Sequence, residues 1–168
     1  MIFVAHGDGH FTAPGWESRC CLGRSGVIAA EDKREGDGAS PIGIWPIRRV
    51  LFRPDRVAAL DTRLEAVPLA PSDGWCDAPD DPAYNRPVSL PWPASAENLW
   101  REDEVYDLIV ILGHNDDPPV PGMGSAIFLH LARPDRSPTE GCVALARPDL
   151  LRLLAEAEPG AAVEIRAA

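Results

Sequence analysis

Short apolar runs separated by turn residues dominate the chain, and this pattern predicts strands rather than helices. Six runs are rich in β-branched or aromatic residues and are bounded by Gly, Pro or Asp, as strands usually are: Ile2–Ala5, Gly26–Ala30, Ile42–Val50, Tyr106–Leu112, Ala126–His130 and Ala162–Ile165. The stretch Asp107–Leu112 is apolar almost throughout, which predicts a central strand that is covered on both faces.

Only one segment has the apolar spacing of a long helix. Pro148 and Asp149 suit a first helical turn, a face of leucines follows, and Pro159 with Gly160 ends the pattern. We therefore predict one main helix over Pro148–Ala157, in a fold that is otherwise mostly β.

The segment Ala66–Pro93 is dense in Pro, Asp and Trp, which predicts a long surface excursion of the kind that often forms a lid or a binding wall. Short helical turns are expected next to it, around Ala94–Trp100. The chain has no internal repeat, low-complexity tract or linker, so we expect a single domain over residues 1–168, and a monomer.

Charge and length exclude several classes of function. The chain carries 16 basic residues against 26 acidic ones, and Lys33 is its one lysine, which argues against a nucleic-acid surface. No apolar run approaches the roughly 20 residues that cross a bilayer, so we expect no membrane span. Residues 1–8 lack the basic and long apolar regions of a secretory signal, which leaves the compartment open.

The four cysteines, Cys20, Cys21, Cys76 and Cys142, show no C-x-x-C spacing for zinc. A disulfide from Cys76 to one of the adjacent pair stays open. The histidines at positions 6 and 10 lie among glycines, which argues against the helix that a metal-binding pair with this spacing requires. We expect no metal and no cofactor.

The segment with the clearest chemical potential runs from His130 to Cys142. A predicted strand ends on His130, and Gly141-Cys142 follows twelve residues later. A thiol nucleophile needs a base to take its proton, and a glycine beside it lets a substrate carbonyl approach the backbone amides. On spacing alone two readings stay open: a nucleophile with its base, or a core cysteine near a strand-end histidine.

A resemblance favours the first reading. From His130 to Leu145 the chain resembles the signature of the L,D-transpeptidase catalytic domain family (YkuD, also ErfK/YbiS/YcfS/YnhG): a histidine, a variable loop, then Ser/Thr-x-Gly-Cys and a hydrophobic residue. Further matches follow the family order at Lys33–Gly43, which holds the sequence EGDG, at Tyr84-Asn85-Arg86 with Ser95–Arg101, and at Gly113-His114-Asn115. The matches span Gly26 to Ile165 and look like the compact proteobacterial branch.

The resemblance implies a fold and a catalytic centre. The family fold is a β-sandwich-like mixed sheet with one main helix after the catalytic cysteine, which lies in a cleft beneath a flap. Cys142 is then the nucleophile and His130 the general base, and the backbone carbonyl just after His130 orients the imidazole. Thr139 and Gly141 shape the oxyanion pocket.

The resemblance also implies an activity on peptidoglycan stem peptides. Family enzymes attack the bond between an L-centre and a D-residue, release the terminal D-amino acid and pass the acyl group to an amine of a second stem. Such enzymes work in the periplasm or cell envelope. Leu131, Glu140 and Ala144 depart from residues frequent in the family, which leaves the crosslink open between the 1,3 type (L-Ala to diaminopimelate) and the 3,3 type.

Four further residues are candidates for substrate binding. A guanidinium suits a diaminopimelate carboxylate, which makes Arg86 the candidate for that contact; the alternative is a salt bridge to a nearby aspartate. Asn85 and Tyr84 are expected to hydrogen-bond the stem backbone, and His114 to form a pocket wall.

Two other functions stay open. An L,D-carboxypeptidase or an amidase would use the same cysteine and histidine and give the acyl group to water. A wall-binding module would keep the fold without the chemistry.

Overall fold

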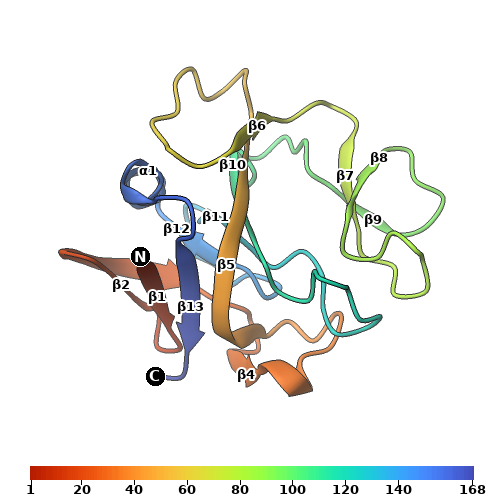
Figure 1. Ribbon diagram of the computed structural model, residues 1–168, viewed down its shortest axis with the longest axis horizontal. Helices are drawn as coiled ribbons and strands as arrows, with labels where there is room; N and C mark the ends of the chain where they lie inside the picture. Colours follow the sequence, from red (N-terminus) through yellow and green to blue (C-terminus); the bar gives the residue numbers. More distant parts are fainter.

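Thirteen strands and one α-helix make up the computed structural model, which describes residues 1–168 (Figure 1). The strands are β1 (Ile2–His6), β2 (His10–Ala13), β3 (Trp16–Cys21), β4 (Val27–Ala29), β5 (Ser40–Phe52), β6 (Ala66–Pro68), β7 (Asp73–Cys76), β8 (Pro87–Ser89), β9 (Ala96–Asn98), β10 (Leu108–Leu112), β11 (Phe128–Leu131), β12 (Val143–Leu145) and β13 (Ala162–Arg166). The helix is α1 (Arg147–Glu156), and a 3₁₀ turn covers Ala30–Asp32.

Eight of the strands close into a ring. They pair in the order β10-β11-β12-β3-β2-β1-β13-β5, and β5 pairs again with β10. The pairs β1–β13 and β11–β12 are parallel, whereas the other pairs of the ring are antiparallel. β4 and β6 pair with β5 outside the ring. The prediction of a mostly β protein with mixed sheets and one main helix is confirmed.

The central strand β10 separates two apolar cores. Its residues Leu108, Val110 and Leu112 belong to the larger core inside the ring, and Ile109 and Ile111 belong to a smaller core on the outer face. All five are buried because successive side chains of a strand point to opposite faces. The apolar run at this position predicted a strand covered on both sides, and this prediction is confirmed.

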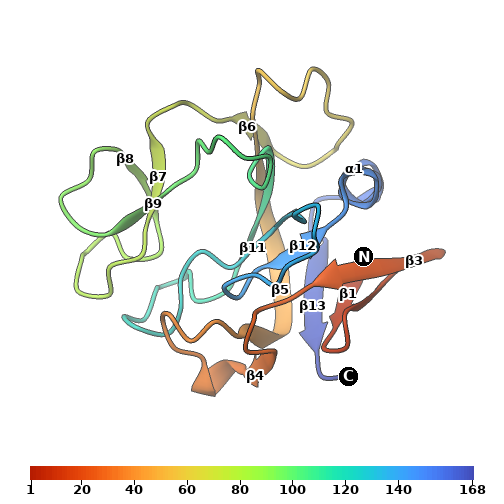
Figure 2. The same ribbon diagram turned by 180° about the vertical axis from the view of Figure 1, so that it is seen from behind.

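A small sheet of β8, β7 and β9 covers the outer core. The N-terminal hairpin is formed by β1, β2 and β3, and the small sheet lies on the other side of β5 and β10 from it (Figure 2). Its Trp75 packs against Phe128 of β11, with ring centroids 5.1 Å apart. The predicted excursion Ala66–Pro93 therefore contains strands and closes over a core.

The helical turns predicted around Ala94–Trp100 are wrong. Residues Ala96–Asn98 form β9 and pair with β7, so that Trp75 lies opposite Glu97. Pairing with a distant segment overrides the local preference of these residues, as tertiary context often does.

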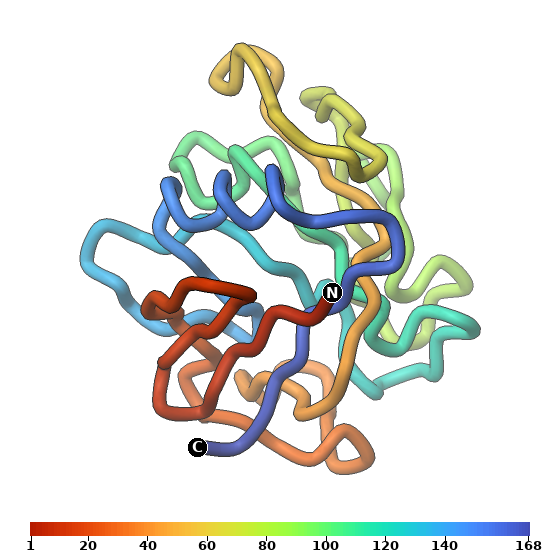
Figure 3. The backbone as a smooth tube through the Cα atoms, turned by 60° about the vertical axis from the view of Figure 1, so that its left-hand side comes forward, coloured from red at the N-terminus to blue at the C-terminus, as the bar shows by residue number.

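The predicted helix is confirmed within one residue at each end, since α1 covers Arg147–Glu156. Leu150, Leu153 and Leu154 are fully buried against the inner core. The tube in Figure 3 shows α1 beside the N-terminal hairpin, and Ser18 of β3 donates a 2.5 Å hydrogen bond to Asp149. Strand β12 lies between the Gly141-Cys142 pair and this helix.

The one helix, α1, has 10 residues, and no helix is long and apolar enough to cross a membrane.

A buried carboxylate ties three parts of the ring together. Asp107 is 1% exposed and accepts hydrogen bonds from Arg56, after β5, at 2.9 Å and from Arg147, at the start of α1, at 2.5 Å. Its backbone carbonyl accepts the N–H of Arg53 at 2.9 Å. Both carboxylate oxygens are therefore occupied by guanidinium donors just before β10 begins.

We expect Asp107→Asn to lower the free energy of unfolding by roughly 2–3 kcal/mol, because two guanidiniums lose a buried counter-charge. Urea denaturation followed by circular dichroism measures the change. Glu158→Gln is the control, since it removes the exposed Arg63–Glu158 pair and should cost less than about 1 kcal/mol. Equal losses for the two variants would show that the buried ion pairs of Asp107 stabilise the fold no more than an exposed ion pair does.

Candidate active site

The parallel pairing of β11 with β12 brings His130 and Cys142 to one face. In this register His130 lies opposite Ala144 and Leu129 opposite Val143, so Cys142, one residue before β12, lines up with Phe128. Leu129 and Val143 point into the inner core. His130 and Cys142 occupy the alternate positions and therefore share the outer face of the ring.

Both side chains open onto one cavity of about 380 Å³. Its lining comes from the loop after the 3₁₀ turn, the small sheet, the approach to β10, and the segments around β11 and β12. The residues that line it are Lys33, Glu35, Gly36, Asp77, Glu97, Arg101, Val105, Tyr106, Ser125, Ala126, Ile127, His130, Arg133, Thr139, Glu140 and Cys142. The cavity is thus polar and charged around a single thiol.

The thiol of Cys142 is almost enclosed, at 8% exposure. It donates a hydrogen bond to the carbonyl oxygen of Ala126 at 3.1 Å and accepts one from the N–H of Phe128 at 3.4 Å. Burial raises the pKa of Cys142 to about 12, and the nearby carboxylate of Glu97 acts in the same direction. The resting group is therefore a neutral thiol.

The imidazole of His130 is oriented by the backbone. Its Nδ1 lies 2.9 Å from the carbonyl oxygen of Leu131, an acceptor that requires the proton to be on Nδ1. Nε2 then carries the free lone pair. Burial lowers the pKa of His130 to about 4, so the ring is a neutral base at pH 7. The edge-to-face contact with Tyr106, 5.4 Å between centroids, fixes the ring plane.

Thr139 and Gly141 shape the turn that carries the thiol. The hydroxyl of Thr139 donates to the carbonyl of Cys142 at 2.6 Å and accepts the N–H of Gly141 at 3.1 Å. Gly141 has φ +137°, and a Cβ there would lie 2.9 Å from the backbone oxygen of Ala39. Only glycine fits this position without strain.

The model of the family described as the YkuD L,D-transpeptidase catalytic domain matches residues 1–165. The chain belongs to this family. Its members are cysteine-dependent enzymes of peptidoglycan, and a cysteine and a histidine facing one cavity agree with that chemistry.

One solved structure resembles the fold of this chain. A solved structure described as the helical cell shape determining protein Pgp2 from Campylobacter jejuni is similar, with a TM-score of 0.47 and 14% identity. The match covers 98% of this chain and 46% of that one, so this chain spans about half the length of that structure. No curated protein sequence matches the chain.

Tyr84 and Asn85, proposed from the family motif as substrate contacts, are buried and hold the walls of the cavity. The hydroxyl of Tyr84 donates to Glu35 at 2.5 Å and accepts the N–H of Gly124 at 3.0 Å. The side-chain oxygen of Asn85 accepts the N–H of Ala126 at 3.0 Å. Asn85 therefore braces the residue whose carbonyl accepts the Cys142 thiol.

His114 and Arg86 lie outside this cavity. His114 is 4% exposed and packs edge-to-face on Trp45, with ring centroids 4.8 Å apart. Burial lowers its pKa to about 4. Arg86 lines a second cavity together with Arg48 and Arg49. The structure brings Cys142, His130 and Thr139 to one cavity and leaves these two elsewhere.

Sequence reasoning did not single out Glu97 and Tyr106, which line the same cavity as Cys142 and His130. Tyr106 donates its hydroxyl hydrogen to Glu97, and burial raises the pKa of that carboxyl. Glu97 lies on β9, a strand that the sequence did not predict, so no local signal could place it. Lys33 is 2% exposed and forms an ion pair with Asp37; both residues lie in the Lys33–Gly43 segment that resembles the family signature.

Because the Cys142 thiol is buried and neutral, its rate of alkylation should depend steeply on pH. Alkylation of Cys142 by iodoacetamide should rise about tenfold per pH unit between about pH 6 and about pH 9, because the thiolate fraction grows throughout this range. Peptide mass spectrometry of timed samples measures the rate at this residue. A rate that levels off below pH 8 would instead indicate a preformed thiolate–imidazolium pair.

The negative charge of Glu97 should slow the alkylation of Cys142. Glu97→Gln keeps an acceptor for the hydroxyl of Tyr106 and removes a negative charge that disfavours the thiolate. We expect the alkylation rate at about pH 8 to rise roughly threefold or more. Glu140→Gln is the matched control, since Glu140 lines the same cavity and pairs with Arg24. Equal rates for the two variants would contradict the proposed electrostatic effect.

Proposed function

We propose that this protein is a peptidoglycan L,D-transpeptidase that works through an acyl-enzyme on Cys142. The observation that carries the proposal is the opening of Cys142 and His130 onto one cavity, with Nδ1 of His130 bound to the Leu131 carbonyl. That bond holds the tautomer whose Nε2 can take a proton. The substrate is the stem peptide of peptidoglycan, and residues 1–168 form one catalytic domain.

In the first half-reaction the Cys142 sulfur attacks the carbonyl carbon between the L-centre and the D-residue of a donor stem. Its proton passes to Nε2 of His130 as the carbon–sulfur bond forms. The carbon–nitrogen bond then breaks, and the imidazolium gives the proton to the departing amine of the D-amino acid. The products are a thioester and a free D-amino acid.

In the second half-reaction an amine of another stem attacks the thioester. His130 takes a proton from this amine, the carbon–sulfur bond breaks, and the thiolate recovers the proton. The new amide bond is the crosslink, of the 1,3 or the 3,3 type. No step uses a metal or an organic cofactor.

Burial determines how the proton moves. A separated thiolate and imidazolium would be unfavourable here, because the pKa of the thiol is raised to about 12 and that of His130 lowered to about 4. Proton transfer therefore accompanies the attack on the substrate. The N–H of Gly141 is occupied by Thr139, so we assign the oxyanion to the N–H of Cys142.

The charges around the cavity suit a stem peptide. Glu35, Asp77 and Glu97 line it with Lys33 and Arg101. Diaminopimelate carries an ammonium and a carboxylate on one side chain, and both charges find counter-charges here. The natural substrate places the protein in the periplasm or at the cell envelope.

Cys142→Ala should abolish new crosslinks in muropeptide digests, because the acyl-enzyme cannot form. His130→Gln should lower the rate by roughly a hundredfold or more, since proton transfer is lost. Purified enzyme and muropeptide monomers are incubated, and mass spectrometry separates dimers from trimmed monomers. Circular dichroism verifies that each variant is folded.

Three outcomes would overturn the proposal. Trimmed monomers alone, with acceptor amine present, would identify a carboxypeptidase or an amidase. Normal crosslinking by Cys142→Ala would exclude Cys142 as the nucleophile. The absence of any carbapenem adduct on Cys142 in the wild type would exclude a thiol transpeptidase and favour a wall-binding module.

A further inference from the structure

A second cavity, of about 350 Å³, lies on the other side of Ile127 from the thiol. Ile127 lines both cavities, and the second is bounded by β5, β7 and the segment after β10. Its residues are Arg48, Arg49, Leu51, Trp75, Asn85, Arg86, Pro87, Ile111, Leu112, Asp116, Ile127 and Phe128. Three arginines thus surround one cavity in a chain of net charge −10.

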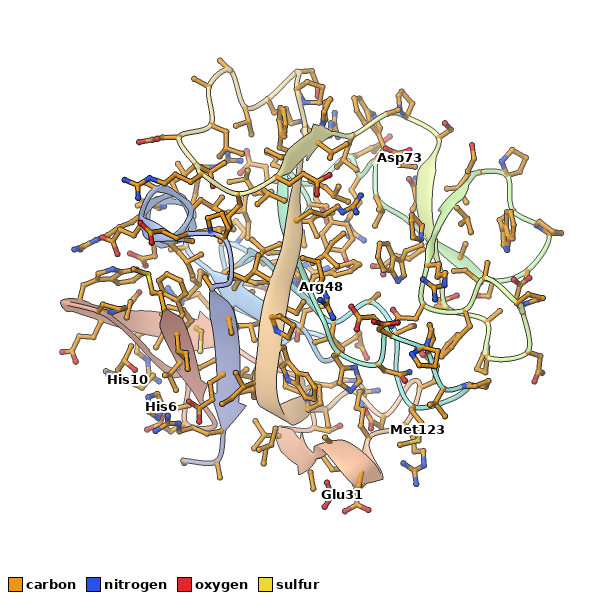
Figure 4. All side chains as sticks on the ribbon, viewed as in Figure 1. His6, His10, Glu31, Arg48, Asp73 and Met123 are labelled. Atoms are coloured by element: carbon orange, nitrogen blue, oxygen red, sulfur yellow. The ribbon has the colours of Figure 1, made fainter.

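Arg48 is held in place at the edge of this cavity. Its guanidinium donates to both carboxylate oxygens of Asp116, at 2.8 and 3.2 Å. In Figure 4 the labelled Arg48 extends from β5 toward the segment after β10. Gly113 makes room for it, because a Cβ at that position would lie 2.7 Å from the Arg48 Nε. The absence of a side chain at position 113 therefore leaves the space that the Arg48 guanidinium occupies.

Arg49 and Arg86 keep donors available. The one ion pair of Arg49, with Glu65, is loose at 3.9 Å, and the two side chains are 48% and 61% exposed. Arg86 follows Asn85, which is fixed at φ +56°, and its carbonyl accepts the N–H of Cys76 at 2.9 Å. The backbone of Arg86 is thus fixed while its guanidinium stays exposed.

The floor of the cavity is apolar. Trp75, Phe128 and Ile111 are buried there, and Leu51 completes the surface. An apolar floor with a few charged groups at the rim is the common composition of a small-ligand site. A guanidinium binds a carboxylate with two parallel hydrogen bonds, whereas the floor accepts an aliphatic group.

We propose that the second cavity binds a carboxylate-bearing peptide, with its carboxylate at Arg49 and Arg86 and an aliphatic side chain on Trp75 and Phe128. This site is separate from the cavity of Cys142. Taking the peptide to be a stem peptide of the cell wall rests on the function proposed above, whereas the anion site itself does not.

The position of the site gives it a connection to the thiol. Phe128 provides part of the floor, and its N–H donates to the sulfur of Cys142 at 3.4 Å. Asn85 lines the same cavity and holds Ala126, the acceptor of the thiol hydrogen. A peptide bound here therefore touches the wall that supports the nucleophile.

The test measures binding with the first cavity blocked. Cys142 is alkylated with iodoacetamide, the adduct is verified by peptide mass spectrometry, and a synthetic stem peptide is titrated by calorimetry. We expect binding that weakens roughly tenfold or more in Arg86→Gln and in Arg49→Gln. Arg63→Gln is the matched control, because Arg63 is an exposed arginine that pairs with Glu158 and does not line the cavity. The same peptide with its carboxylates amidated should not bind.

Loss of binding on alkylation, or equal affinity in Arg86→Gln and Arg63→Gln, would overturn the proposal. So would Arg86-dependent binding of inorganic phosphate without binding of the peptide. The result is independent of catalysis: a protein that binds the peptide through Arg86 but forms no crosslink disproves the proposed function and keeps the anion site.

Discussion

The parallel pairing of β11 with β12 is the constraint on which the rest of this structure depends. Parallel neighbours are usually joined by a long crossover, often a helix, yet here the connection is only residues 132–142. The loop is held by Thr139, whose N–H donates to the Leu22 carbonyl at 2.9 Å and whose carbonyl accepts the N–H of Arg24 at 2.8 Å. The register of two short strands therefore depends on contacts with a distant segment.

In this register one face of the two strands packs into the inner core and the other lines the cavity. Leu129 and Val143 face the inner core, and His130 and Cys142 face the cavity. A slip of one residue would turn His130 and Cys142 into the inner core, and Leu129 and Val143 toward the cavity. Burial of the inner core thus fixes the positions of His130 and Cys142. The same enclosure moves the pKa of the thiol up and that of the imidazole down, so the pair rests uncharged.

The sequence was most informative where one local pattern was sufficient. The apolar run of β10 and the leucine face of α1 were predicted from spacing, and the Gly-Cys motif identified the nucleophile candidate. The hairpin of β2 and β3 was not predicted, because its exposed positions carry polar residues such as Glu17 and Arg19. β9 exists only because it pairs with β7, so the placement of Glu97 beside Cys142 is a tertiary property that no spacing encodes.

Arg86 shows that adjacent residues of one motif can lie in different surroundings. From the sequence, Arg86 is a candidate for binding the substrate carboxylate, and Tyr84 and Asn85 are candidates for hydrogen bonds to the stem backbone. In the fold, Tyr84 and Asn85 turn inward and brace the wall, whereas Arg86 turns to the second cavity. Asn85, between Tyr84 and Arg86, has a φ of +56°, in the left-handed region that non-glycine residues seldom occupy.

Asn85 also connects the small sheet to the wall around the Cys142 thiol. Its side chain accepts from Trp75 at 2.9 Å and donates to the carbonyls of His114, at 3.1 Å, and Asn115, at 2.7 Å. A fourth bond holds Ala126, a non-glycine residue at φ +52°, which is an uncommon conformation that the surroundings must maintain. The carbonyl of Ala126 then receives the thiol hydrogen. One buried amide thus connects the small sheet, the segment after β10 and Cys142, so the excursion acts as a brace for the thiol as well as a cover for the outer core.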